Sequence, residues 1–227
     1  RDVSIVVLPG SSWDGATGQS NIAATLAHCE AMKNRIVIID PPAKTEFNNA
    51  VTVNALGLPT STYSVLYYPR VAMANPLYHP DKAPGKDKTV MVSPSAIAAG
   101  MWAKIDGKRG VWKAPAGVEA RLTGAAGLEY VVENLEQDQL NPLGVNCIRK
   151  LPGYGSVFWG ARSLATKADP QWRYVPVRRT AIYIEESVYN SIQWAVFEPN
   201  SHLLWSSLRA SIDSFMNGLF RAGAFQG

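Results

Sequence analysis

The chain has 227 residues, and its content of 47% hydrophobic and 18% charged residues excludes disordered and collagen-like proteins. The formal net charge of +4 is too modest to require a nucleic-acid partner. No apolar run approaches the roughly 20 residues that span a membrane, and the N-terminus lacks the features of a signal peptide, so we expect no stable membrane insertion and no export by that route. The two cysteines, Cys29 and Cys147, lie outside any CxxC spacing and predict packed, reduced thiols.

The first seventy residues predict a layered α/β unit. Short β-branched runs indicate strands, and an Ala-rich segment after a Gly-rich loop indicates a helix. The order strand, helix, strand is typical of a βαβ unit with parallel, buried strands. The expected elements are strands at 3–9, 35–40 and 61–69 and helices at 19–34 and 45–58, with Thr45 as the cap of the second helix.

The middle of the chain begins with an exposed loop. Residues 75–89 are dense in Pro, Gly and charge, a composition typical of a surface connection. A brief strand follows. The next helix is expected to start at Ser93 or Ser95, with Pro94 near its first turn, and to end at Gly107.

Apolar residues at helical spacing predict three helices in the remainder. The first covers 128–141, and the other two form a C-terminal pair that meets at Pro199, with Ser201 as the cap of the last helix. We expect the stripe of the last helix to pack on the preceding helix or on the sheet. The apolar stripes comprise Leu128, Val131, Val132 and Leu135, then Ile184, Val188 and Ile192, and finally Leu204, Leu208, Ile212, Phe215 and Leu219.

These elements predict an α/β fold of mixed α+β character. The expected architecture is a layered sheet with flanking helices and a C-terminal helical pair. We expect a single domain over 1–227, with a βαβ-like half at 1–70 and a second half at 90–227 that ends in the two helices.

Charge is distributed unevenly along the chain. Residues 118–138 hold five acidic residues against Arg121, whereas residues 145–179 hold seven Lys or Arg against Asp169. The two regions could face each other on neighbouring copies. Alternatively, both are solvated, or they meet within one chain.

The sequence carries no motif of the common catalytic devices. It lacks a phosphate-binding P-loop, a GxSxG elbow and paired metal-binding histidines, and the adjacent Glu185 and Glu186 diverge by about 100° on a helix. We therefore expect neither an enzyme nor a cofactor or metal site. The alternative is a nucleotide- or small-ligand-binding α/β protein that uses the Gly-rich loop 10–18 before its first helix.

Aromatic and Arg residues alternate in the stretch GSVFWGARSLATKADPQWRYVPVRR, residues 155–179. This pattern suits a nucleic-acid-binding surface. It equally suits a protein–protein interface, where Trp, Tyr and Arg most often carry binding energy. Without catalytic geometry, protein–protein contact is the favoured interpretation.

Five ordered motifs in this later part resemble one known family. They are GVWKAPAG (110–117), NPLGVNCIRKLPGYGSVFWGARSLA (141–165), WRYVPVRRTAIYIEESV (172–188), WAVFEPNSHLLW (194–205) and GAFQG (223–227). In order and spacing they resemble the sheath protein of contractile phage tails and related injection machines. The first ninety residues resemble that family only loosely.

The resemblance implies a structural subunit rather than an enzyme. It implies copies stacked as six-fold helical rings around an inner tube protein, with baseplate and tail-terminator proteins as further partners and no direct nucleic-acid contact. Such a sheath is assembled in the bacterial cytoplasm as part of a phage tail or an extracellular phage-tail-like particle, and it contracts to drive the tube through a target envelope. Family members also carry N- and C-terminal strand-exchange arms, which this sequence lacks, so we expect it to be a fragment.

The resemblance also suggests residues with structural or intersubunit roles. The alternative is that each Trp packs in the core and that the Arg side chains cap helices or pair with Glu185, Glu186 or Glu198. We expect charge reversal at the paired arginines 178 and 179 to impair assembly while sparing the monomer fold. The candidate residues are Trp112, Lys113, Trp159, Arg162, Trp172, Arg178 and Arg179.

Overall fold

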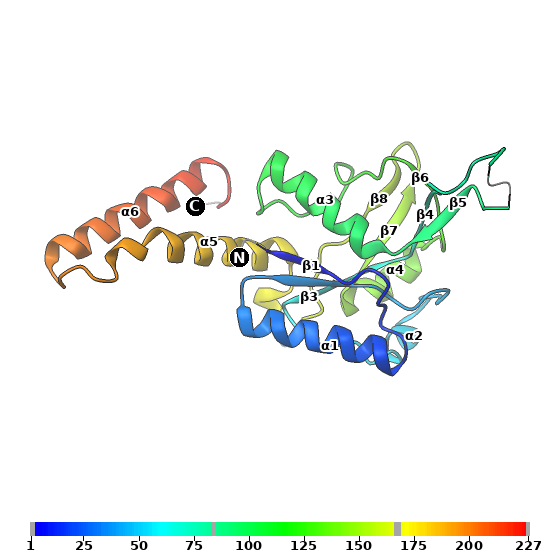
Figure 1. The fold of residues 1–227 in the computed structure, drawn as a ribbon, viewed down its shortest axis with the longest axis horizontal. Coiled ribbons are helices and arrows are strands. Elements are labelled where there is room, and N and C mark those ends of the chain that lie inside the picture. Colours follow the sequence, from blue (N-terminus) through cyan, green and yellow to red (C-terminus); the bar gives the residue numbers. More distant parts are fainter. Residues whose placement is uncertain (1–2, 83–84, 166–168, 226–227) are drawn as a thin grey trace.

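The computed structural model describes residues 3–82, 85–165 and 169–225, and its body is built around a five-stranded sheet (Figure 1). The strand order is β1-β2-β3-β7-β8. The first four strands are parallel, and β8 returns antiparallel to β7 as a hairpin. The strand bounds are β1 Ile5–Val7, β2 Ile36–Ile39, β3 Ser64–Tyr68, β7 Val145–Leu151 and β8 Gly155–Phe158.

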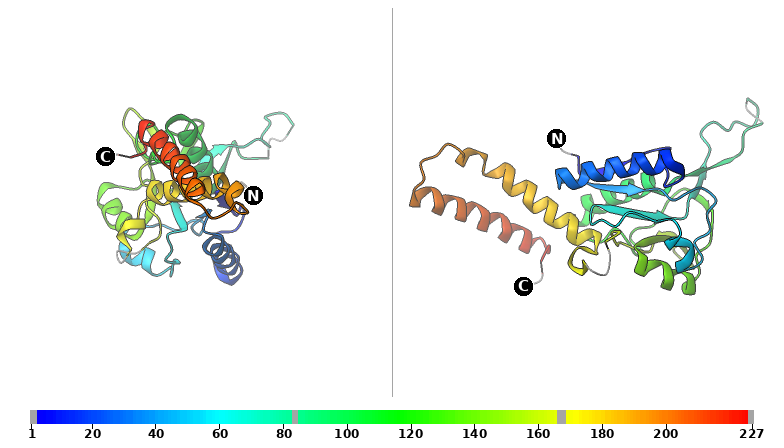
Figure 2. Two further views of the ribbon diagram at one scale, coloured as in Figure 1. Left: turned by 90° about the vertical axis from the view of Figure 1, so that its left-hand side faces the viewer. Right: turned by 90° about the horizontal axis from the view of Figure 1, so that it is seen from below.

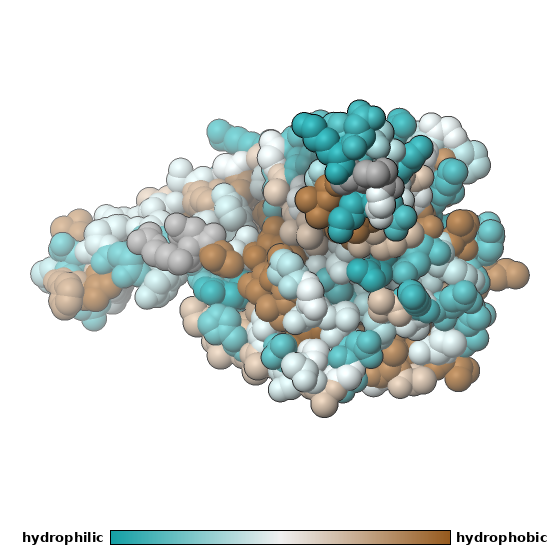
Figure 3. Space-filling view, turned by 45° about the vertical axis from the view of Figure 1, so that its right-hand side comes forward, coloured by the Kyte–Doolittle hydropathy of each residue, from teal (hydrophilic) through white to brown (hydrophobic). Residues whose placement is uncertain are grey.

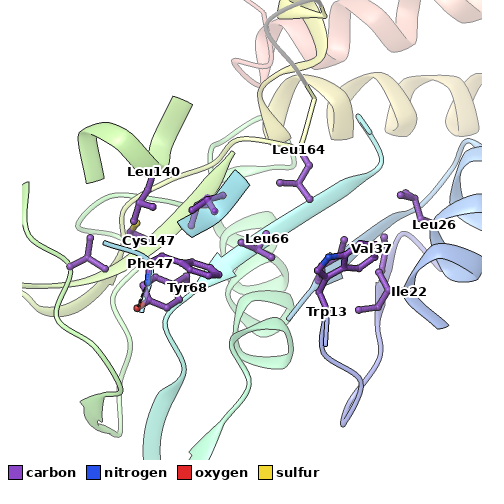
Figure 4. Packing of buried hydrophobic residues seen from close by; sticks show 14 of the residues in the cluster. Trp13, Ile22, Leu26, Val37, Phe47, Leu66, Tyr68, Leu140, Cys147 and Leu164 are labelled. Carbon is purple, nitrogen blue, oxygen red and sulfur yellow. Dashed lines mark hydrogen bonds between the residues drawn. The ribbon is translucent and has the colours of Figure 1, made fainter. Parts of the chain in front are cut away.

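Hydrophobic cores cover both faces of this sheet. Alternate residues of β2 point to opposite faces, so Val37 and Ile39 enter one core and Ile36 and Ile38 enter the other. Figure 4 shows the first core, in which the backbone N–H of Phe47 donates a hydrogen bond to the Tyr68 hydroxyl oxygen, 3.2 Å away. The helices α1 (Gly15–Met32), α2 (Ala50–Asn54) and α4 (Asn134–Leu140) flank this core, and α3 (Pro94–Arg109) with the start of α5 (Val175–Ser191) flanks the second. The predicted βαβ unit and layered α/β class are confirmed.

A second, smaller sheet stands beside the first. Its antiparallel strands lie in the order β5-β4-β6, with bounds β4 Val71–Ala74, β5 Thr89–Val92 and β6 Ala125–Leu128. The segment between β4 and β5 projects from the body, as expected for residues 75–89 (Figure 1), and it is mostly hydrophilic (Figure 3). The strands β4, β6, β7 and β8 were not predicted, because short segments become strands only when distant strands supply their partners.

Two predicted helices are shorter than expected. The helix expected at 45–58 is α2, and its cap is Asn49 rather than Thr45. The Asn49 side chain accepts hydrogen bonds from the N–H groups of Val51 and Thr52, at 2.8 and 3.0 Å. Asn was overlooked as a cap because Thr45 also matches the capping pattern.

The helix expected at 128–141 begins only at Asn134. Leu128 ends strand β6, and Glu133 and Glu136 form a capping box that starts α4. The prediction was wrong because the apolar residues of this stretch serve different purposes: Val132 is buried in the first core, whereas Leu135 is 78% exposed. In α3, Ser93 is the N-cap and Pro94 lies in the first turn as expected, but the helix continues past Gly107 to Arg109.

The C-terminal helical pair projects from the body as a hairpin (Figures 1 and 2). The helix α5 is followed by a short 3-10 turn, Gln193–Ala195, and then by α6 (His202–Arg221). Ser201 caps α6 by accepting the N–H of Leu204, as predicted. The rings of Tyr183 and Phe215 lie 6.3 Å apart, so the apolar stripe of α6 packs back on α5.

Both cysteines are free and buried, as predicted. Burial raises the pKa of Cys29 to about 11 and that of Cys147 to about 12. The thiols therefore stay protonated and unreactive at neutral pH.

Candidate subunit-contact surface

Arg178 lies inside the chain, stacked between two aromatic rings. Its guanidinium carbon is 4.1 Å from the ring centre of Tyr63 and 4.5 Å from that of Trp172. The residue is 8% exposed, and its Nε donates to no acceptor in the described part of the chain. Burial lowers the pKa of Arg178, and the Glu185 carboxylate opposes that shift. Two ring faces thus replace the water that this cation would otherwise hold.

Arg179, the next residue, forms a forked ion pair. It donates two hydrogen bonds to the carboxylate of Asp106 near the end of α3, one of them 2.8 Å long. Its guanidinium also lies 4.7 Å from the ring centre of Trp102, whose Nε1 donates to the Tyr67 hydroxyl at 2.9 Å. This network joins the N-terminal part of α5 to α3 and to β3 in the middle of the sheet.

The two arginines therefore make intrachain contacts. Arg179 pairs with Asp106 rather than with Glu185, Glu186 or Glu198. A glutamate in place of Arg179 would face the Asp106 carboxylate, and a glutamate at position 178 would be buried between two rings. The expectation that charge reversal spares the monomer fold is thus revised, because both substitutions remove contacts that hold α5 to the body.

Trp159 and Arg162 follow the end of β8. Asn146 of β7 accepts the Arg162 N–H at 2.7 Å and donates to the Arg162 carbonyl at 2.7 Å, so both amide groups of its side chain hold this turn. The Arg162 side chain donates to the carbonyl of Asn141 and lies 5.7 Å from the ring centre of Tyr174. The backbone N–H of Trp159 donates to the carbonyl of Cys147 at 2.8 Å, but 38% of the residue's surface is exposed.

Trp112 and Lys113 follow the end of α3. The Lys113 ammonium donates to the carbonyl of Ala114, 3.2 Å away. Trp112 lines a groove of about 670 Å³ between the residues just before β1, the end of α3 and the face of α5 that carries Arg179 and Ile182. Tyr183 and Glu186 line the same groove. The sequence predicted Glu186 only in solvent or in a salt bridge. In the structure it lines the groove beside Tyr183, because residues three apart share one face of a helix.

The Gly-rich loop 10–18 contributes to the core. Trp13 is 8% exposed, and its Nε1 donates to the carbonyl of Leu56 at 2.9 Å. Gly18 lies in α1, where a Cβ would come within 2.3 Å of the Ser12 carbonyl oxygen. Gly18 therefore allows the loop and the helix to pack closely together. This structural role explains the glycine without a bound phosphate.

The far end of the helical hairpin exposes large apolar side chains. Phe197 is 97% exposed and Leu203 82% exposed, and Trp194 and Trp205 are about half exposed. Hydrophobic side chains are visible at this end in Figure 3. The sequence pattern showed only the buried stripe of α6, since exposure at the turn depends on what the hairpin leaves uncovered.

The acidic and basic regions meet within the chain at several points, one of them at Arg149. Arg149 of β7 donates to the side chains of Gln137 and Asn134 in α4, at 2.9 and 2.8 Å. These partners are amides rather than carboxylates, so the carboxylates of the acidic region are not neutralised there. Lys167, one of the basic residues, lies outside the described residues.

Within residues 3–82, 85–165 and 169–225, no group of three or more His, Cys, Asp or Glu side chains is arranged to hold a metal ion. In the same ranges, no helix has the length and hydropathy needed to cross a membrane.

Comparison with known proteins places the chain in a family. Residues 1–164 match the family model of the phage tail sheath protein central domain, and residues 167–227 match that of the phage tail sheath C-terminal domain. The chain belongs to the phage tail sheath family. The match includes the first ninety residues, where the sequence motifs indicated only a loose resemblance.

Relatives and solved structures agree with this membership. A prophage major tail sheath protein of Pseudomonas aeruginosa is 29% identical over 136 residues, which are 57% of this chain and 34% of that protein. The contracted sheath complex of PVC, an extracellular contractile injection system, aligns with a TM-score of 0.81 and 28% identity over 100% of this chain and 58% of that one. The six-fold symmetrised baseplate of the anti-feeding prophage aligns with a TM-score of 0.78 and 31% identity over 99% of this chain and 55% of that one.

A crystal structure of a sheath tail protein from Desulfitobacterium hafniense shares the fold, with a TM-score of 0.61, 13% identity and coverage of 99% of this chain and 47% of that one. The sheath-family chain described here spans little more than half the length of the injection-system proteins that it matches.

Proposed function

We propose that this chain is the core of a contractile sheath subunit, which polymerises as six-fold helical rings around an inner tube and contracts to drive that tube through a target cell envelope. The observation that carries the proposal is the continuous match to both sheath domain models, over residues 1–164 and 167–227. The likeness to proteins titled as a contracted sheath complex and as a baseplate supports it.

The physical requirements of such a subunit fit the fold. Contraction without nucleotide hydrolysis requires bodies that keep their fold while their mutual contacts change. Here both sheet faces are covered by apolar cores, and the hairpin is joined to the body through the Arg179–Asp106 pair and the Arg178 stack. We propose on this basis that the two matched regions act as one rigid domain.

The proposed partners are further copies of the chain, the inner tube protein, and the baseplate and tail-terminator proteins. The subunit would be assembled in the bacterial cytoplasm and would belong to a phage tail or to an extracellular injection particle. Among the candidate residues, exposed Trp159 and groove-lining Trp112 suit contact with a partner. Arg162, Trp172, Arg178 and Arg179 suit the rigid joint, and Lys113 lies beside Trp112.

Electron microscopy of the complete gene product that contains this chain tests the proposal. The purified protein is incubated with and without its tube protein and stained beside the 227-residue chain at equal concentration. We expect tubes or stacked rings from the complete product. If it stays monomeric under every assembly condition, with the tube protein present, the proposed function is wrong.

A further inference from the structure

The groove beside α5 has two aromatic walls. On one side, the Trp112 indole lies against the backbone of Gly110, where an added Cβ would come within 2.3 Å of the ring. Gly110 has a φ of +90°, so the chain reverses there and presents Trp112 to the groove. On the other side, Tyr183 of α5 is 42% exposed. Trp112 and Tyr183 both line the groove, and the Tyr183 ring also packs near that of Phe215 in α6.

The described lining of the groove carries an excess of negative charge. Its only described cation, Arg179, already donates two hydrogen bonds to Asp106, which neutralises both groups. Glu186 remains as a carboxylate with no ion-pair partner among the described residues. The other described side chains that line the groove are uncharged: Val3, Ser4, Asn34, Val111, Ile182, Ser187 and Asn190.

We infer that this groove binds a Lys or Arg side chain of a second copy of the chain, held by the Glu186 carboxylate and by the rings of Trp112 and Tyr183. A carboxylate beside aromatic faces is the environment that favours an ammonium or guanidinium group. The net charge of +4 makes the chain itself a source of such groups, and Lys86 and Lys88 are exposed on the projecting segment before β5.

The contact would be heterologous, because the groove and the donor lie on different parts of the subunit. The projecting segment lies at the end of the body away from the hairpin (Figure 1). Repeated contacts of this kind form rings or helical polymers rather than closed dimers. The inference rests on the proposed function, since it assigns one contact of the proposed polymer.

The first test compares two adjacent glutamates in the complete gene product. Glu186→Gln removes the charge from the groove, and Glu185→Gln removes the same charge from the neighbouring residue, which does not line it. We expect Glu186→Gln to raise the concentration needed for assembly, measured by sedimentation, by about fivefold or more, the effect of roughly one cation–π-assisted ion pair. The Glu185→Gln variant should assemble like the wild type, and the Glu186→Gln monomer should keep the wild-type melting temperature.

The second test probes the groove without assembly. N-acetyl-arginine amide is titrated into the 227-residue chain, and the indole N–H resonance of Trp112, assigned with Trp112→Phe, is followed by NMR. We expect a saturable shift in the wild type and in Glu185→Gln but not in Glu186→Gln.

The outcomes separate the two proposals. If the wild type fails to assemble, the proposed function is wrong, and the titration still decides whether the groove binds a cation. If the wild type and Glu186→Gln assemble alike, the second copy is not the occupant, even where the probe binds. If the probe shifts Trp112 equally in Glu186→Gln, the cation site itself is refuted.

Discussion

Arg178 and Arg179 are consecutive, yet they stabilise the chain in different ways. The first is held by ring faces without a carboxylate, and the second by a carboxylate with a ring beside it. The flat shape of the guanidinium group stabilises Arg178, whereas its positive charge stabilises Arg179. Different substitutions can remove these two properties separately.

Replacing Arg179 by Met should destabilise the fold by about 2–4 kcal/mol, because the partly buried Asp106 carboxylate would lose its counter-charge. Asp106 keeps 27% of its side-chain surface exposed, so water offsets part of the loss. Urea denaturation measures the change, and Asp106→Asn combined with Arg179→Met should recover part of it. A double variant that is as unstable as the sum of the two single variants would show that the pair is not coupled.

Replacing Arg178 by Lys keeps the charge and removes the flat guanidinium. We expect a loss of about 1–2 kcal/mol, since an ammonium cannot lie flat between the Tyr63 and Trp172 rings. Thermal and urea unfolding measure it. The matched control is Arg209→Lys on the exposed side of α6. If Arg178→Lys is as stable as Arg209→Lys, stacking of the guanidinium does not stabilise the fold.

Asp40 should make folding stability depend on pH. It is 3% exposed and accepts hydrogen bonds from the N–H and hydroxyl of Ser95, at 2.8 and 2.6 Å. Burial raises the pKa of Asp40, and the hydrogen bonds from Ser95 oppose this shift only in part. Because the folded pKa is raised, protonation adds stability that is complete below the ordinary carboxyl pKa of about 3.9 and is lost as pH rises through the folded value.

Asp40→Asn carries no titrating proton, so it isolates this effect. We expect the unfolding free energy of the wild type minus that of Asp40→Asn to fall as the pH is raised above 4. Urea denaturation of the two proteins across pH 4–8 measures the difference. A difference that grows with pH would mean that the folded state favours the ionised form of the Asp40 carboxylate.

The start of α2 depends on which polar side chain reaches its first free N–H groups. For α2, Asn49 reaches two of them, whereas Thr45 lies outside the helix. Asn49→Ala should therefore cost about 1 kcal/mol, and Thr45→Ala should cost much less. Urea denaturation of the two variants decides between the start at 50 and the predicted start at 45, and a larger loss from Thr45→Ala would favour the latter.

The α5–α6 hairpin buries one stripe and leaves the rest exposed. Leu219 near its C-terminal end is 7% exposed, while Phe197 at the turn is 97% exposed. Leu219→Ala should lower stability by about 2–3 kcal/mol, and Phe197→Ala should change it by less than about 0.5 kcal/mol. Equal melting temperatures of these variants would mean that α6 does not pack as a unit of the fold.

The sequence predicted some elements of the body and the hairpin and missed others, for physical reasons. The parallel βαβ unit was predictable because the run at 35–40 is short, largely apolar and closed by two prolines, and the run at 61–69 has the alternating pattern of a strand. The helical pair was predictable because Pro199 and Ser201 mark a break and a new start. The expected helix at 128–141 failed because periodicity alone cannot distinguish a helix from a loop that anchors one buried residue, Val132.

Local patterns thus determined the α/β class, the parallel strands, the helical pair and the motifs that resemble the sheath family. Tertiary contacts decided the rest: the partners of Arg178 and Arg179, the small sheet around β4, and the groove that brings Trp112, Tyr183 and Glu186 together. These residues come from segments separated by about seventy positions, and no short-range pattern records which distant side chain a buried charge will meet. Propensity and periodicity act within a few residues, whereas pairing, burial and charge compensation depend on the folded whole.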